Sequence, residues 1–76
     1  MKNVKISLRS FEDMKEFNKI TCGFDYPIDV ANGNYIVNAK SIMGLFTFDT
    51  NKDIDLIIHS DNYKDYLSRI GKFLVD

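Results

Sequence analysis

Residues 26–39 read YPIDVANGNYIVNA, and this stretch decides the fold. Apolar and polar residues alternate on both sides of Asn32-Gly33, which is the spacing of two strands that each bury one face. Asn-Gly readily adopts positive φ, so the Asn32-Gly33 pair predicts a tight turn between the strands. Pro27 suits the start of a strand or an edge strand. The stretch therefore predicts a β-hairpin.

The segments on either side of the hairpin supply two more strands and a first helix. Residues 4–8 and 54–58 alternate with the period of a half-buried strand. Ser10 and Asp13 have the spacing of a capping box, which predicts the start of an amphipathic helix that ends before Gly23. Its apolar residues recur at helical spacing: Phe11, Met14, Phe17 and Ile20.

Two further helices are predicted after the hairpin. Ser41 suits the N-cap of a short helix, because Gly44 breaks the apolar stretch that follows too much for a good strand. The pair Ser60-Asp61 is interpreted as the cap of a closing helix. The apolar residues of that helix are Tyr63, Tyr66, Leu67, Ile70, Phe73 and Leu74.

The resulting order, β-α-β-β-α-β-α, predicts a single α+β domain over residues 1–76. We expect an open-faced β-sandwich, in which a mostly antiparallel four-stranded sheet carries three helices on one face and meets water on the other. A chain of this size buries only about 60% of the surface of its unfolded form, so every apolar face is needed for the core.

Composition and charge exclude several classes of function. The net charge is −1 and no two Lys or Arg residues are adjacent, which argues against nucleic acid as a partner. Charged residues make up 28% of the chain, and residues 1–6 lack the apolar core of a signal peptide, so we expect a cytoplasmic protein without a membrane span. The single cysteine, Cys22, predicts no disulfide, metal site or cofactor, and we expect it to be buried.

Residues 37–45 read VNAKSIMGL, and this segment resembles the regulatory-serine segment of the HPr family of bacterial phosphocarrier proteins. Within that family it is more similar to the catabolite-repression homologue Crh. The strand, short helix and strand from Asn38 to His59 align with the family without a gap, and the predicted element order agrees over the whole chain.

The resemblance implies a regulatory role for Ser41. In the family the equivalent serine is phosphorylated by a dedicated HPr serine kinase, and the phosphorylated form binds a transcriptional repressor of carbon catabolite genes. In the family the exposed residues of the helix that follows form an apolar docking patch, and the resemblance therefore implies partner-binding roles for Ile42, Met43 and Phe46, with Lys40 beside them. From the residues alone, a helix cap is sufficient to explain Ser41, and its apolar neighbours could belong to the core.

The histidine that carries phosphate in HPr is missing from the equivalent position. Residues 8–14 read LRSFEDM, without histidine or proline and with two acidic residues that would repel a phosphoryl group. Phosphoryl transfer needs a neutral imidazole nucleophile and cationic donors nearby. We therefore expect no catalytic residue and no enzyme activity, and we interpret Arg9 as a solvated surface charge.

Two alternatives stay open. The only histidine, His59, is expected on the open sheet face with Asp55 and Ile57, where it could serve as a phosphocarrier in place of the lost histidine. A structural role is the other alternative, in which the hairpin or the open face pairs with a second copy. The chain is accordingly expected to be a monomer or a weak homodimer, with components of the phosphotransferase system among its protein partners.

Overall fold

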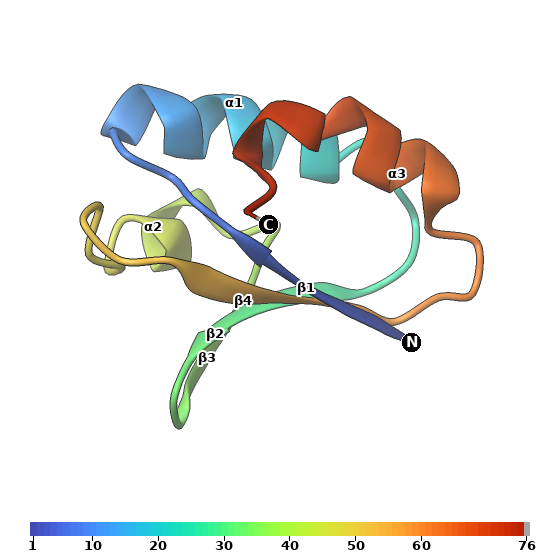
Figure 1. Ribbon diagram of the computed structural model, residues 1–76, viewed down its shortest axis with the longest axis horizontal. Coiled ribbons are helices and arrows are strands. Elements are labelled where there is room, and N and C mark those ends of the chain that lie inside the picture. The colour runs from blue at the N-terminus through green and yellow to red at the C-terminus, as the bar shows by residue number, and fades with distance from the viewer. Residues whose placement is uncertain (76) are drawn as a thin grey trace.

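The computed structural model describes residues 1–75, and its elements follow the predicted order (Figure 1). The strands are β1 (Lys2–Ile6), β2 (Ile28–Asn32), β3 (Tyr35–Asn38) and β4 (Ile54–Ile58). The helices are α1 (Phe11–Thr21), α2 (Ile42–Leu45) and α3 (Lys64–Arg69), and a 3₁₀ turn, η1, follows at Gly71–Phe73.

The four strands form one antiparallel sheet in the order β1-β4-β2-β3. Val4 and Val30 both pair with Leu56, so residues of the same parity share a face across three strands. Helices α1 and α3 cover one face, and the opposite face is open (Figure 1). The predicted α+β open-faced sandwich is confirmed.

The core lies between the sheet and the helices and follows the period of two in the strands. The even-numbered apolar residues of β1, β2 and β4 belong to the core, and the core side chains that they meet come from all three helices. The fully buried members of the core are Ile6, Leu8, Met14, Phe17, Ile28, Val30, Ala39, Leu45, Leu56, Ile58, Tyr66 and Ile70. Thr21 is the buried polar residue of this region, and its Oγ1 lies 2.7 Å from the Tyr66 hydroxyl.

Helix α1 begins where the capping box predicts. Ser10 has extended backbone angles, and its Oγ accepts a hydrogen bond from the Asp13 N–H at 3.0 Å. The Asp13 carboxylate accepts in turn from the Arg9 N–H, one residue before the cap. The first bond is that of a capping box, whereas the return bond goes to the N–H of Arg9 rather than to that of the cap residue Ser10.

The predicted closing helix is shorter than expected, and its predicted cap is wrong. Ser60 instead accepts the N–H of Asn62 in a local turn, and α3 begins at Lys64 without a side-chain cap. After Arg69 the chain passes through η1, and Leu74 is extended and bridges to Ile6. Serine often forms local turns of this kind, and a glycine, here Gly71, weakens helix continuation.

The hairpin turn is centred one residue later than predicted. Asn32 pairs with Tyr35, which leaves Gly33 and Asn34 as the two central residues. Gly33 has φ of 62°, and no other residue described has positive φ. Positive φ at the first central position alone is the pattern of a type II′ turn, whereas the predicted asparagine-glycine centre would give type I′.

The prediction that Cys22 is buried is wrong. Cys22 is the C-cap of α1 and is exposed, because the preceding Thr21 occupies the inward position at the end of the helix. The thiol lies 3.6 Å from the Lys40 carbonyl oxygen, which places the end of α1 beside the segment that leads into α2.

The two edges of the sheet differ. At the β1 edge the Ser7 N–H donates to the Phe73 carbonyl and the Val75 N–H donates to the Lys5 carbonyl, so the segment after η1 covers part of that edge. At the other edge β3 pairs only with β2.

Candidate functional site

Ser41 caps α2 and is exposed to solvent. Its Oγ accepts a hydrogen bond from the Gly44 N–H at 3.2 Å, and its carbonyl accepts from the Leu45 N–H at 3.0 Å. Its own N–H donates to the Asn38 carbonyl at 3.0 Å, which ties the cap to the end of β3. The hydroxyl is therefore held in one place while remaining accessible.

Gly44 explains why α2 sits so close to β3. A Cβ added at Gly44 would lie 3.2 Å from the Val37 Cβ and 3.4 Å from the Ser41 Oγ. Larger residues would push the helix away from the strand, because real Cβ atoms rarely approach other atoms so closely. Gly44, which makes the stretch after Ser41 a poor candidate for a strand, thus allows α2 and its Ser41 cap to lie close to β3.

The residues predicted to bind a partner differ in exposure. Met43 is 74% exposed, and Leu45, on the opposite side of the helix, is fully buried. Ile42 and Phe46 are half-buried and pack partly against the core, because positions four apart lie on the same flank of a helix. Lys40 is half-buried, and its N–H donates to the Asn38 side-chain carbonyl at 2.9 Å.

Phe11 extends this surface, although the sequence pattern placed it with the core of α1. It is 55% exposed, and its ring packs edge-on against Phe46 with the ring centres 5.2 Å apart. As the first residue of α1 it lies beyond the turns that cover the sheet, which a helical period alone does not reveal. We refer to Phe11, Ile42, Met43 and Phe46 as the apolar patch.

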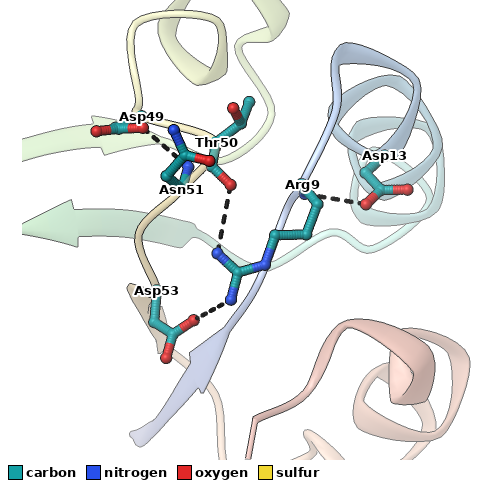
Figure 2. A network of polar contacts seen from close by, with 6 residues as sticks. All are labelled: Arg9, Asp13, Asp49, Thr50, Asn51 and Asp53. Atoms are coloured by element: carbon teal, nitrogen blue, oxygen red, sulfur yellow. Dashed lines mark hydrogen bonds and ion pairs between the residues drawn. The ribbon is translucent and has the colours of Figure 1, made fainter.

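Arg9 lies in the connection between β1 and α1, and its guanidinium is paired rather than freely solvated. Figure 2 shows it reaching the loop before β4, where Nη2 lies 3.1 Å from Asp53 Oδ1 and Nη1 donates to the Thr50 carbonyl at 3.3 Å. The pair remains at the surface, with about half of the Arg9 side chain exposed. The Arg9 guanidinium, which is the cation of this connection, is therefore already paired with the Asp53 carboxylate.

His59 follows β4 at the end of the strand opposite to Asp53. It lies on the open face, as expected, and its Nε2 is 2.9 Å from Asp29 Oδ2. Both side chains are about one-third exposed. The imidazole thus faces a carboxylate, and the cation of the β1–α1 connection lies at the other end of β4.

Two hollows on the molecule lie away from Ser41. A hollow of about 380 Å³ lies between the end of α1 and α3, and another of about 360 Å³ lies beside the β1 edge. Ser41 and His59 line neither of them. Within residues 1–75, no group of three or more His, Cys, Asp or Glu side chains is arranged to hold a metal ion. None of the helices described has the length and apolar character needed to cross a membrane.

Titration behaviour is altered away from Ser41. Burial raises the pKa of Tyr66 far above its usual value, and the Thr21 hydroxyl opposes this shift only in part. Burial also raises the pKa of Tyr26, with a further contribution from the negative charge of Asp65. The pKa of Lys5 is raised by its hydrogen bond to Asp55 on the open face.

Comparison by sequence finds no match to a family model and none to a curated protein. Solved structures do match over nearly the full length. HPr-C-His from Thermoanaerobacter tengcongensis matches with a TM-score of 0.78 and 24% identity, covering 95% of this chain and 89% of that one. The phosphocarrier protein HPr from Bacillus anthracis gives a TM-score of 0.73 and 23% identity, with coverages of 97% and 94%.

Crh from Bacillus subtilis, described as a domain-swapped intertwined dimer, gives a TM-score of 0.66 and 22% identity, with coverages of 96% and 90%. The expected likeness to HPr and Crh is thus found in the structure as well as in residues 37–45. The chain has the HPr fold.

Proposed function

We propose that this protein is a non-catalytic regulator or adaptor related to the phosphotransferase system, and that it acts in the cytoplasm through phosphorylation of Ser41. The observation that carries the proposal is the exposed Ser41 at the start of a short helix whose next residues include Met43, which is 74% exposed. The resemblance of residues 37–45 to the HPr regulatory segment supports the same assignment.

The surroundings of Ser41 suit a phosphate. The first turn of α2 holds no acidic residue, so an added phosphate meets no fixed negative charge there. The N–H groups of the first residues of a helix lack partners within it, and phosphate oxygens are strong acceptors. A phosphoryl group of charge about −1.5 to −2 would therefore change the surface beside Met43 without removing the cap.

The apolar patch suits a protein partner. Methionine is flexible and adapts to more than one apolar surface, and Met43 is the most exposed residue of the patch, while Ile42 and Phe46 are half-buried. A partner that covers Met43 and contacts Phe11 and Phe46 would read the charge on Ser41 at the rim of its interface. By resemblance, the kinase is an HPr serine kinase and the reader is a transcriptional repressor.

A phosphocarrier role through His59 is less well supported. The imidazole faces Asp29, whose negative charge repels an incoming phosphoryl group, and Arg9 is paired with Asp53 at the other end of β4. Incubation with phosphoenolpyruvate and the first enzyme of the phosphotransferase system should therefore produce no acid-labile phosphoprotein.

The proposal is tested by incubating the protein with a purified HPr serine kinase and ATP, followed by mapping of the phosphate by mass spectrometry. Ser41→Asn is the best negative control, because asparagine caps a helix as well as serine does but cannot accept phosphate. Ser68→Ala, at an exposed serine of α3, is the matched control that should still be modified. Phosphate confined to Ser41 is expected; no modification, or modification that persists in Ser41→Asn, would refute the proposal.

Binding is the second stage of the test. The Ser41-phosphorylated protein should bind the repressor more tightly than the unmodified protein does, and Met43→Asp should weaken that binding while leaving phosphorylation intact. If Met43→Asp binds as well as the parent protein, the apolar patch is not the docking surface.

A further inference from the structure

The outer edge of β3 carries backbone groups that are not used within the fold. Tyr35 pairs with Asn32, and the Ala39 N–H donates to the Ile28 carbonyl, so alternate residues of this segment form their hydrogen bonds toward β2. The N–H and C=O of Ile36 and the N–H of Asn38 therefore point outward. The Asn38 carbonyl already accepts the Ser41 N–H. No loop or side chain of residues 1–75 forms a hydrogen bond with Ile36.

The β1 edge of the sheet is protected, whereas the β3 edge is not. Proteins usually guard edge strands with charged residues or cover them with another segment. The β1 edge has Lys2 and Lys5, and the segment through Val75 covers part of it. Strand β3 reads YIVN and contains no charge and no proline. Ser41 occupies the Asn38 carbonyl at one end of this edge, but Ile36 is 58% exposed.

We propose that two copies of the chain pair through the outer edges of their β3 strands. The strands run antiparallel about a two-fold axis at Ile36, so that the outward N–H and C=O of Ile36 in each copy bond to those of the other. Asn34 then lies opposite Asn38 of the second copy. Residues 34–38 contain no charge, so self-pairing places no like charges opposite one another.

The size of the edge determines the strength of the pairing. A four-residue strand offers much less than the roughly 800 Å² per partner of a standard stable interface. The dimer is therefore weak and forms only at high protein concentration. Pairing would bury no charged side chain, because the contact consists of backbone groups and the Ile36 side chain.

Such a dimer has a defined geometry. A two-fold axis between antiparallel edge strands is perpendicular to the joined sheet, so the helix-covered faces of both copies lie on the same side (Figure 1). The two apolar patches would then face a partner together, and a partner with two matching sites would gain avidity. This consequence rests on the proposed function, whereas the pairing itself does not.

The test is sedimentation equilibrium of the full chain over a wide range of concentration, together with amide hydrogen exchange. We expect a monomer–dimer equilibrium in which protection of the Ile36 amide increases with concentration. Ile36→Lys should shift the dissociation constant upward by at least tenfold. Ile57→Lys, a matched change on the open face away from the β3 edge, should leave the dissociation constant unchanged.

A backbone change provides the decisive second variant. N-methylation of Ile36 in a chemically assembled chain removes the outward donor without introducing charge and without breaking a bond to β2, so it should abolish dimers in a folded protein. A protein that stays monomeric at millimolar concentration, or a dimer that N-methylation leaves intact, would overturn the proposal. So would loss of the dimer in Ile57→Lys, since that result would indicate stacking of the open faces.

Discussion

The hydrogen bond between Thr21 and Tyr66 offers a stability test whose size follows from burial. Their oxygens are 2.7 Å apart, and both residues are fully buried. Tyr66→Phe removes one partner and leaves the Thr21 hydroxyl unpaired inside the core, and Thr21→Val does the reverse. Each single change should lower the free energy of unfolding by about 1–3 kcal/mol, the usual penalty for a buried polar group without a partner.

The double variant should behave differently from the sum of the two. Valine and phenylalanine have nearly the shapes of threonine and tyrosine, so Thr21→Val with Tyr66→Phe removes both polar groups and leaves neither unpaired. We expect it to lose less than the two single changes together, with a coupling energy of about 1–2 kcal/mol.

Urea denaturation followed by circular dichroism measures all four proteins in one cycle. The slope of the free energy against urea should stay constant, so that differences in midpoint report stability alone. In a domain of this size, 1 kcal/mol corresponds to about 4–8 °C in Tm, which thermal unfolding can resolve. Additive single and double changes would show that the two hydroxyls are not coupled, and would refute the inference that each hydroxyl satisfies the other inside the core.

Three further predictions concern pH, packing and surface charge. Because burial raises the pKa of Tyr66 and Tyr26 above the value of about 10 in the unfolded chain, the folded protein keeps protons that the unfolded chain loses, and stability should fall as pH rises above about 10. Urea midpoints between pH 8 and 11 test this, and a midpoint that does not change would contradict it. Gly44→Val should lower the free energy of unfolding by about 1–3 kcal/mol through its clash with Val37, and Val37→Ala should restore part of it in urea titrations. If Gly44→Val is as stable as the parent, α2 does not depend on the close approach to β3. Arg9→Met should reduce stability by only about 0.2–1 kcal/mol, since its pair with Asp53 is solvent-exposed; a loss above about 2 kcal/mol would indicate a larger structural role for the network in Figure 2.

The strands and two of the helix starts could be predicted because each depends on local chemistry. Alternation in residues 54–58 marks the core face of β4, whereas β1 lies two residues earlier than the predicted 4–8 and the buried Leu8 follows the strand. The side-chain caps at Ser10 and Ser41 form with nearby backbone amides. The antiparallel sheet with helices on one side then follows, because this element order leaves few other arrangements.

The errors arise where tertiary contacts compete with a local signal. Ser60 turns back on Asn62 rather than capping α3, and Leu74 leaves the helical period to bridge to Ile6 at the β1 edge. Cys22 lies outside because Thr21 takes the buried position with Tyr66. Each outcome depends on a partner that is distant in sequence or on a choice between two local hydrogen bonds.

The candidate site shows the same division. Ser41 could be predicted from its helix-cap position and from the nine-residue resemblance. Phe11 could not be predicted as part of the site, because α1 and α2 meet only in the folded chain. The pairing of Arg9 with Asp53 could not be predicted either, because the two residues are 44 positions apart and local sequence patterns do not relate charges at that separation.

The position of β1 in the sheet has a consequence for the order of folding. Its partner strand β4 lies far along the chain, as the contact between Lys5 and Asp55, 50 positions apart, shows. The β2–β3 hairpin closes through only two central residues, so its loop costs far less entropy than the loop that joins β1 to β4. We therefore expect the hairpin to form early, and β1 to join a sheet that β2, β3 and β4 have already built.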